Sequence, residues 1–395
     1  MGEAGGERLS FAVMTEIVDV PQAIGVEPVD LASFDLASLA NLDDFEVAAR
    51  TRLSRFAYDY YAGGSYDELT LADNQDAFRR RKLVYRVLRD LSTRTLATTV
   101  LGQPVSMPVL VAPTAFHRLA HEEGEVATAR AAAAQGTVMM LSTLSTCTLE
   151  AVCGTGAAVW FQLYVYRDRG ATRALVERAE AAGCQALVLT VDAQLWGRRE
   201  RDVRNRFSLP PGIECVNLDG TAMARLPEGV SGSGLSAYVM SLFDPALSWK
   251  DLAWLASISK LPVVVKGIVH PDDARLAAEH GATAVIVSNH GGRQVDTAVA
   301  TLDALPAVVE AVDGRIEVLL DGGIRRGSDV IKALALGARA VGVGRPVLWG
   351  LAIAGQQGVE LALQRLRDEL DVVMGLCGCA SPAEVTRDLI FAGPI

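Results

Sequence analysis

The stretch AVIVSNHGGRQVD, residues 284–296, decides how the fold of this chain is interpreted. Its first four residues are apolar and mostly β-branched, which predicts a short strand buried on both faces. The strand leads directly into His290, two glycines and Arg293. Histidine can accept a proton near neutral pH, arginine can hold a carboxylate through two parallel hydrogen bonds, and glycine lets a ligand approach the backbone closely. A single histidine in such a turn more often has a structural role, so the rest of the chain has to decide.

Seven further runs of the same kind predict strands, and together with the first they make eight. The predicted strands cover residues 108–112, 137–141, 158–163, 186–189, 262–265, 284–287, 317–320 and 340–343. Ala-rich amphipathic segments of helical length lie between most neighbouring strands, at residues 122–135, 169–183, 271–281 and 328–337. Strand and helix that alternate eight times predict a (β/α)8 barrel of the α/β class.

Polar and ionisable residues follow every predicted strand. In chain order the strand ends carry Pro113-Thr114-Ala115, Ser142, Gln162 with Tyr164, Thr190 with Asp192, Lys266, Ser288 with His290 and Arg293, Asp321 with Gly323 and Arg325, and Gly344-Arg345. Enzymes with this fold place their active sites at the carboxyl ends of the strands. The sequence therefore predicts one active site to which all eight strands contribute.

The last two strand ends have the pattern of a phosphate site. The loop DGGIRRGS, residues 321–328, leads into a helix whose expected N-cap is Ser328, and Gly344-Arg345-Pro346 follows the eighth strand. Backbone N–H groups at glycine turns and helix N-termini bind anions, and this fold usually binds phosphate after its seventh and eighth strands. We therefore expect a ligand that carries a phosphate group.

The chain divides into an N-terminal extension, residues 1–40, that we expect to be poorly ordered, a barrel domain, residues 41–380, and a C-terminal tail, residues 381–395. Residues 42–61 predict one helix that ends in an aromatic cluster before Gly63 and Gly64. The interval between the fourth and fifth strands is unusually long, and residues 209–247 show little periodicity. That segment is expected to be a mobile loop over the pocket mouth, with an inert insertion as the alternative.

Composition excludes several classes of protein. The chain has 395 residues, of which 50% are hydrophobic, and a formal net charge of −10, so it can bury a large core but lacks the basic character of nucleic-acid-binding proteins. It contains no membrane-spanning or signal-peptide pattern, and its six cysteines show no disulfide or zinc framework, so we expect a cytoplasmic protein. His117 and His121 have helical metal-ligand spacing without the glutamate of that motif, so we expect no metal site.

Between about residues 42 and 378 the chain resembles the FMN-dependent α-hydroxy acid oxidase and dehydrogenase family. The resemblance rests on the motifs YDYY (58–61), APTA (112–115), FQLY (161–164), LTVD (189–192), GRRE (197–200), VKG (265–267), SNHGGRQ (288–294), DGGIRRG (321–327) and GRP (344–346). It implies an FMN cofactor held by Pro113, Thr114, Ala115, Ser142, Gln162, Thr190, Lys266, Ser288, Asp321, Gly323, Arg325, Gly344 and Arg345. In this family the lysine lies at flavin N1, where a fixed ammonium offsets the negative charge of the reduced ring.

The resemblance also implies the catalytic roles. His290 matches the base that removes a proton, Asp192 the carboxylate that pairs with the resulting imidazolium, and Tyr164 the phenol that hydrogen-bonds to the reacting oxygen. Arg199 and Arg293, helped by Tyr60, match the groups that hold the carboxylate of an (S)-2-hydroxy acid. Whether the proton leaves the hydroxyl group or Cα stays open at this point.

Three residues depart from the pattern of glycolate-handling members or distinguish members from one another. Leu144 stands where those members carry a tryptophan and Phe116 where they carry a methionine, so both are expected in a wider, apolar substrate pocket for mandelate-like or medium- to long-chain acids. Ala115 favours oxygen as the electron acceptor, with hydrogen peroxide as product, because some dehydrogenases have glycine there. The alternatives are a dehydrogenase with a separate electron acceptor, a flavin-dependent isopentenyl diphosphate isomerase and a non-catalytic flavin-binding module. The resemblance further implies a homo-oligomer, a tetramer or an octamer.

Overall fold

The computed structural model describes residues 35–218 and 243–393. The predictions for residues 1–34 and for most of the insertion at 209–247 lie outside the described residues. From Leu39 onward the described residues belong to one compact unit.

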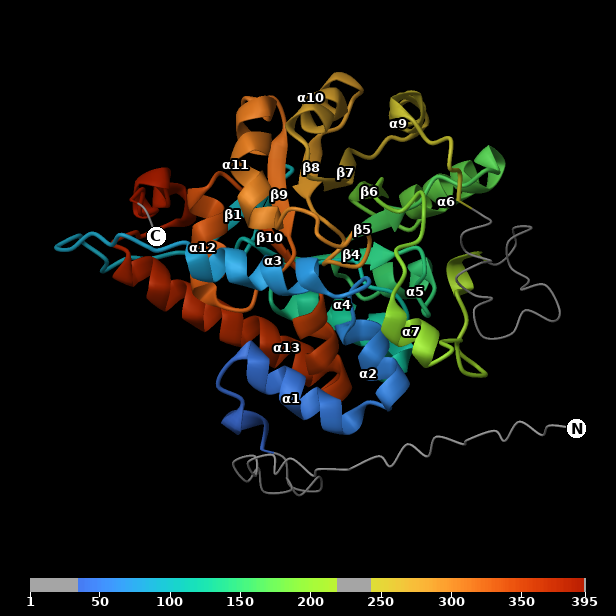
Figure 1. The fold of residues 1–395 in the computed structure, drawn as a ribbon, viewed down its shortest axis with the longest axis horizontal. Helices are drawn as coiled ribbons and strands as arrows, with labels where there is room; N and C mark the ends of the chain where they lie inside the picture. The colour runs from blue at the N-terminus through green and yellow to red at the C-terminus, as the bar shows by residue number, and fades with distance from the viewer. Residues whose placement is uncertain (1–34, 219–242, 394–395) are drawn as a thin grey trace, which may run out of the picture. The chain divides into compact units, whose positions relative to one another are not determined.

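A closed barrel of eight parallel strands forms the centre of this unit (Figure 1), which confirms the predicted (β/α)8 architecture. The strand order around the barrel is β10-β3-β4-β5-β6-β7-β8-β9. The strands are β3 (Val109–Val111), β4 (Val138–Ser142), β5 (Ala158–Leu163), β6 (Ala186–Thr190), β7 (Val263–Ile268), β8 (Ala284–Val287), β9 (Glu317–Asp321) and β10 (Val341–Val343). Each of them overlaps the run of residues that predicts it. They are buried along almost their whole length, which is why their sequences are continuous apolar runs.

A short hairpin closes the amino-terminal end of the barrel. Its strands are β1 (Thr98–Val100) and β2 (Gln103–Val105), which pair antiparallel. Val100 and Val105 share one buried cluster with Trp160 and with residues at the starts of the barrel strands. Gln103 accepts a hydrogen bond from the Trp160 indole at 3.3 Å. Because this end is filled by side chains, only the carboxyl end of the barrel is left to receive a ligand.

Helices surround the barrel in the alternation that the sequence predicts. They are α4 (Gly124–Ala134), α5 (Leu149–Cys153), α6 (Arg169–Ala181), α7 (Glu200–Arg204), α9 (Trp249–Ile258), α10 (Pro271–Glu279), α11 (Thr301–Val312), α12 (Gly327–Ala335) and α13 (Arg345–Leu376). Short 3-10 turns lie at Leu36–Ser38, His117–Leu119, Val216–Leu218, Pro382–Glu384 and Arg387–Leu389. Within the described residues, no helix is long and apolar enough to cross a membrane.

The expected N-cap of α12 was wrong by two residues. The helix begins at Gly327 and its N-cap is Arg326 rather than Ser328. The Asp329 carboxylate accepts hydrogen bonds from the backbone N–H groups of Arg325 and Arg326, at 3.0 and 2.9 Å. This aspartate satisfies the first free donors of the helix and so draws the start of the helix toward the preceding loop.

The predicted single helix over residues 42–61 is in fact two helices, α1 (Leu42–Arg52) and α2 (Arg55–Ala62). Leu53 is extended, and the Ser54 side chain accepts a hydrogen bond from the backbone N–H of Ala57, which starts α2 in a new direction. Helix α1 lies along α13 (Figure 1), whereas α2 carries Tyr60 and Tyr61 to the carboxyl end of the barrel. A third helix, α3 (Leu69–Arg80), follows.

The described part of the C-terminal segment 381–393 packs on the same unit. Leu389 is buried, and Ile390 forms an isolated antiparallel bridge with Leu83.

Two glycines bring the two parts of α13 into contact. The helix is interrupted at Ala354 and Gly355, whose backbone angles are not helical. The parts meet so closely at Gly350 and Gly358 that a Cβ added at Gly358 would lie 1.9 Å from the carbonyl oxygen of Gly350. Since backbone cannot move aside as a flexible side chain can, any larger residue must separate the two segments.

We therefore expect Gly358→Ala to lower the free energy of unfolding by about 3 kcal/mol, the cost of overpacking a rigid contact. The matched control is Gly375→Ala in the same helix, where an added Cβ would meet only the Arg94 side chain at 3.4 Å. That control should be neutral or stabilising by up to about 1 kcal/mol, because alanine favours a helix interior. Urea unfolding of both variants checks this, and equal midpoints for the two would contradict it.

Candidate active site

A cavity opens at the carboxyl ends of the barrel strands. All eight strands or the loops that follow them contribute to its wall, together with α2. The predicted site residues that line it are Tyr60, Pro113, Thr114, Ala115, Ser142, Leu144, Gln162, Tyr164, Thr190, Arg199, Lys266, His290, Arg293, Asp321, Gly323, Arg325, Gly344 and Arg345. Asp192 and Ser288 lie directly behind the wall, where they bond to lining residues.

His290 and Asp192 form a hydrogen-bonded pair at one side of the cavity. Nδ1 of the imidazole lies 2.8 Å from Oδ1 of Asp192. Burial lowers the pKa of His290 below its ordinary value, although Asp192 opposes this shift, so the ring is neutral at pH 7 with Nε2 not engaged by Asp192. Burial raises the pKa of Asp192, but His290 and Lys266 outweigh it, and the pKa of the carboxyl is lowered. The pair therefore offers a neutral base backed by an ionised carboxylate.

The backbone of this region is shaped to bring the pair together. His290 adopts a left-handed conformation with φ of 58°, which is uncommon for a residue that is not glycine. Gly267 also has a positive φ, 111°, and a Cβ at this position would lie 2.7 Å from the Asp192 side chain. The glycine of the Val-Lys-Gly sequence is thus required for the close approach of Asp192 to β7.

Lys266 projects from β7 onto the floor of the cavity. Its ammonium donates a hydrogen bond to Ser288 Oγ at 3.0 Å and pairs with Asp321 Oδ2 at 3.3 Å. Burial lowers the pKa of Lys266, but Asp321 and Asp192 more than compensate and raise it, so the lysine is a permanent cation. Asp321 Oδ1 is buried without a hydrogen-bond partner among the described residues.

Two arginines, Arg199 and Arg293, line the same cavity as His290. Arg199 is 4% exposed, and its Nε and Nη1 atoms have no hydrogen-bond partner within the described residues. Its guanidinium carbon stacks 4.2 Å from the centre of the Trp196 ring. Burial and the neighbouring Arg293 lower the pKa of Arg199 to about 10. A buried guanidinium with free donors, next to a second cation, is a site for an anion.

Arg293 is partly committed to the protein itself. Its Nη1 donates to the carbonyl oxygens of Tyr60 and Gly63, at 2.7 and 2.8 Å, and its guanidinium lies 5.0 Å from the centre of the Tyr60 ring.

A second pair of arginines, Arg325 and Arg345, also lines the cavity. Arg345 donates to the carbonyl oxygens of Tyr61, Gly63 and Gly291, at 2.9, 3.0 and 3.1 Å. Arg325 donates to the carbonyl oxygen of Ile324 at 2.9 Å. Burial lowers the pKa of both guanidiniums, most strongly for Arg345. These cations flank the glycine turn of the loop after β9 and the start of α13, the position where this fold binds phosphate.

A family model described as FMN-dependent dehydrogenase matches residues 49–392. The chain belongs to the FMN-dependent dehydrogenase family. An L-lactate oxidase of a Nostoc species is 55% identical over 90% of this chain and 99% of its own length, and the glycolate oxidase of Spinacia oleracea is 50% identical over 90% and 96%. A mandelate oxidase structure with (S)-4-hydroxymandelic acid superposes with a TM-score of 0.84 at 45% identity, over 89% of this chain and 98% of that one. The protein is thus an FMN-dependent enzyme of the 2-hydroxy acid oxidase type.

The residues of the cavity fit an FMN molecule. The arginines at the end of β9 and the start of α13 match its phosphate, and the unpartnered oxygen of Asp321 matches a hydroxyl donor of its ribityl chain. In the middle, Gln162 bonds to Thr190 at 3.0 Å and to Ser142 at 3.2 Å, which presents amide and hydroxyl groups to the polar edge of a flavin. Lys266 would supply a fixed positive charge beside the bound ring.

Several functional neighbours were missed by sequence reasoning. Trp196 lines the cavity, and Phe243 stacks on Tyr164 with ring centres 4.4 Å apart. Trp196 follows Asp192 in an irregular loop, and Phe243 lies in the insertion that lacks periodicity, so no pattern indicated either residue. Only the unusual length of the insertion indicated that this part of the chain could contribute to the site.

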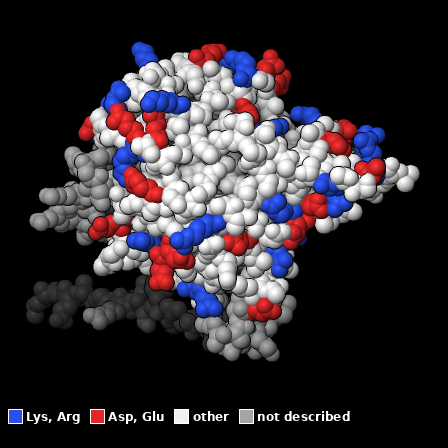
Figure 2. Space-filling model, turned by 180° about the vertical axis from the view of Figure 1, so that it is seen from behind, with Lys and Arg blue, Asp and Glu red and all other residues white. Residues whose placement is uncertain are grey.

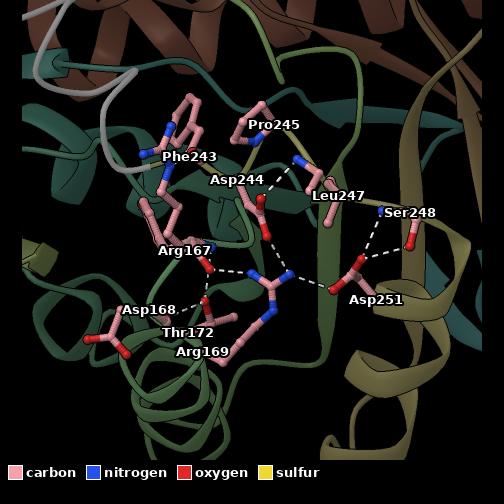
Figure 3. A network of polar contacts seen from close by, with 12 residues as sticks. Arg167, Asp168, Arg169, Thr172, Phe243, Asp244, Pro245, Leu247, Ser248 and Asp251 are labelled. Atoms are coloured by element: carbon pink, nitrogen blue, oxygen red, sulfur yellow. Dashed lines mark hydrogen bonds and ion pairs between the residues drawn. The ribbon is translucent and has the colours of Figure 1, made fainter.

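Phe243 is held by a network of charged groups (Figure 3). Arg169 Nη2 donates to Asp244 Oδ2 and Asp251 Oδ1, both at 2.6 Å, and Arg167 donates to the Phe243 carbonyl oxygen at 3.0 Å. The first residues of α6 and α9 thereby fix the ring that backs Tyr164.

Phe116 lies away from the cavity wall, contrary to its expected role. It is 2% exposed and packs 5.5 Å from the Tyr60 ring and 6.4 Å from the Phe207 ring. Its carbonyl oxygen accepts a hydrogen bond from the Tyr61 hydroxyl at 2.6 Å. The residue packs in the aromatic cluster that also contains Tyr60 and Phe207.

The ring of His117 has two hydrogen-bond partners within the protein. His117 is buried in a 3-10 turn and its ring nitrogens lie 2.6 and 3.0 Å from the hydroxyl oxygens of Thr114 and Thr128. No group of three or more possible metal ligands occurs in the described part of the chain.

We expect Lys266→Met to weaken FMN retention and to lower the reduction potential of the bound flavin, because the reduced anionic ring loses its counter-charge. Lys260→Met, at an exposed position, is the matched control and should change neither quantity. Fluorescence of released FMN and a redox titration measure the two effects. A potential that stays constant or rises would show that another group neutralises the reduced ring.

Proposed function

We propose that this enzyme oxidises an (S)-2-hydroxy acid larger than glycolate to the 2-oxo acid and passes the electrons to oxygen, which gives hydrogen peroxide. The observation that carries the proposal is the buried guanidinium of Arg199, whose Nε and Nη1 lack a hydrogen-bond partner among the described residues, in the same cavity as the neutral His290, since together they match an acid that must also lose a proton. Bound FMN supplies the two-electron acceptor.

In the proposed reaction Arg199 and Arg293 hold the substrate carboxylate and Tyr60 borders the same anion site. Burial raises the pKa of the Tyr60 hydroxyl, so the phenol stays protonated and can donate a hydrogen bond. Desolvated charge pairs of this kind give both orientation and binding energy.

His290 acts as the general base. Its depressed pKa leaves the imidazole free to accept a proton at neutral pH, and ionised Asp192 then stabilises the imidazolium. Burial and Asp192 raise the pKa of Tyr164, which therefore remains a hydrogen-bond donor for the reacting oxygen. The same base serves whether the proton comes from the hydroxyl group or from Cα.

The size of the substrate is inferred from Leu144, which lines the cavity and leaves more space than the tryptophan of the glycolate-handling pattern. The similarity to a mandelate oxidase with (S)-4-hydroxymandelic acid supports a large acid. Lactate is the competing substrate, favoured by the 55% identity to an L-lactate oxidase and by Trp196, which occupies part of the wall.

Oxygen is proposed as the acceptor because Ala115 lines the cavity and because the similar proteins above are oxidases by name. A dehydrogenase with a separate acceptor is the alternative. Persistence of the reduced flavin for minutes in air would decide for that alternative.

We also propose a homo-oligomer of four or eight subunits in the cytoplasm that does not bind nucleic acid. Figure 2 shows one face on which acidic and basic side chains alternate around a broad uncharged centre. Tyr85, Val87 and Leu88 are exposed by 69, 69 and 102%, more apolar surface than a monomer needs to expose. Analytical ultracentrifugation measures the subunit number.

The pH dependence of flavin reduction tests the base. Activity should rise with pH through the pKa of His290, because only the neutral imidazole accepts a proton. Asp192 raises that pKa, so Asp192→Asn should move the acid limb of kcat/KM to lower pH while it lowers the maximal rate. His290→Gln should retain FMN but slow flavin reduction on the order of 10² to 10⁴-fold. Stopped-flow flavin reduction across pH measures both effects. If the acid limb of kcat/KM does not shift in Asp192→Asn, Asp192 does not influence the pKa of the base.

Arg199→Lys should reduce kcat/KM by roughly tenfold, about 1.5 kcal/mol, because an ammonium cannot form two parallel hydrogen bonds to a carboxylate. Arg204→Lys is the matched control on the exposed side of α7 and should leave the kinetics unchanged. Parent-like kinetics in Arg199→Lys would mean that Arg293 alone holds the acid.

Leu144→Trp should shift preference toward small acids. An apolar pocket gains about 0.8 kcal/mol per buried methylene, so three or four carbons of added bulk separate large from small acids by more than tenfold in the parent enzyme. Competition between mandelate and glycolate in flavin reduction measures the ratio. If glycolate is the better substrate of the parent, or if the ratio does not change in the variant, the size argument is wrong.

A further inference from the structure

Two thiols that the proposed reaction does not use lie together at the far end of the barrel. The Sγ atoms of Cys153 and Cys184 are 3.6 Å apart. Cys153 is the last residue of α5 and is partly exposed, whereas Cys184 precedes β6 and is 4% exposed. They are 31 residues apart in the chain, and no motif in the sequence links them.

The backbone on both sides of the pair is fixed. The N–H of Cys184 donates to Ala179 at the end of α6, and the next residue, Gln185, donates to Val159 of β5 at 2.8 Å. The N–H of Gly154 donates to Glu150 at 2.8 Å, which closes the last turn of α5. The backbone beside both cysteines is thus hydrogen-bonded to α5, α6 or β5. The two sulfur atoms can therefore approach each other only by rotation of their side chains.

The pair lies far from the cavity. Both cysteines precede the strands β5 and β6, at the amino-terminal end of the barrel, whereas the cavity opens at the carboxyl end. A bond between them would leave the positions of the cavity residues unchanged.

We propose that Cys153 and Cys184 form a peroxide-reactive thiol pair that closes to an intramolecular disulfide. The Cys153 thiolate attacks one oxygen of hydrogen peroxide and the O–O bond breaks, which gives a sulfenic acid and hydroxide. Cys184 then attacks the sulfenic sulfur, loses its proton and displaces the hydroxyl group as water. In sum two thiols and one hydrogen peroxide give one disulfide and two waters.

The surroundings assign the order of the two thiols. The hydrogen bond with Cys184 lowers the pKa of Cys153, against burial and Glu150, and the same interaction raises the pKa of Cys184. Glu150 is itself paired with Arg178 at 2.9 Å, which reduces its repulsion of a thiolate. Cys153 is therefore the more exposed and more acidic thiol that meets the oxidant, and Cys184 is the buried thiol that resolves the sulfenic acid.

The inference rests on the proposed function only for the source of the oxidant, since oxidation of the substrate by oxygen would produce hydrogen peroxide at each turnover. The thiol chemistry itself is tested with added peroxide and no hydroxy acid.

The first experiment treats the FMN-loaded enzyme with a small excess of hydrogen peroxide, then unfolds it in an alkylating reagent and measures the intact mass. Of six cysteines, four should remain available for alkylation, dithiothreitol should restore all six, and a peptide map should link Cys153 to Cys184. Cys377→Ser is the matched control and should lose the same two thiols. The midpoint of thermal unfolding should rise by about 5 °C on oxidation, because a loop of this length is closed in the unfolded chain.

Single variants test the assigned order. Cys184→Ser should accumulate a sulfenic acid at Cys153 that dimedone traps. In Cys153→Ser, peroxide should not oxidise Cys184, and dimedone should therefore not label it. Six free thiols after peroxide treatment, or a disulfide between other cysteines or between molecules, would overturn the proposal.

A turnover experiment separates the two proposals. Loss of the two thiols during oxidation of a 2-hydroxy acid in air, prevented by catalase, supports both. A disulfide that forms with added peroxide but never during turnover upholds the thiol pair and counts against peroxide as the product of the enzyme.

Discussion

The ion pair between Lys266 and Asp321 is the interaction on which the rest of the site depends. It connects β7 and β9 across the carboxyl end of the barrel, with Ser288 from the loop after β8 bonded to the same ammonium. An isolated buried cation would lose its proton or destabilise the fold. Because a carboxylate partner compensates the cost of burial, the enzyme can keep a full positive charge on the floor of an enclosed cavity.

The same compensation extends to the base. Lys266 lies close enough to Asp192 to lower the pKa of that carboxyl, and Asp192 in turn orients His290 at 2.8 Å. Asp321, Lys266, Asp192 and His290 follow one another from β9 to the loop after β8, and neighbouring groups shift the pKa of Lys266, Asp192 and His290. A change at one member should therefore be felt at the others, and in the proposed reaction Lys266 would influence both the cofactor and the proton acceptor.

Sequence reasoning found the barrel and most of the cavity lining because both depend on local patterns. A buried parallel strand is a continuous apolar run, and the residue that follows it lies at the active end of the fold. Two errors arose at helix starts that are capped by a side chain three or four residues away, and the third arose where contacts distant in sequence decide the packing. Ser54 starts a new helix, Asp329 moves the start of α12, and Phe116 turns away from the pocket. Trp196, Phe243 and the two neighbouring thiols could not be found for the same reason, since only the folded chain brings their partners to them.

The hairpin formed by β1 and β2 has a consequence for the order of events in catalysis. The hairpin fills the amino-terminal end of the barrel with Val100 and Val105, so the acid and its oxo product would both pass through the carboxyl end. In the proposed reaction the product departs before the next acid can reach Arg199, and both molecules carry the same carboxylate. On that proposal the oxo acid competes with the hydroxy acid for one site, so release of the product would limit turnover as the product accumulates.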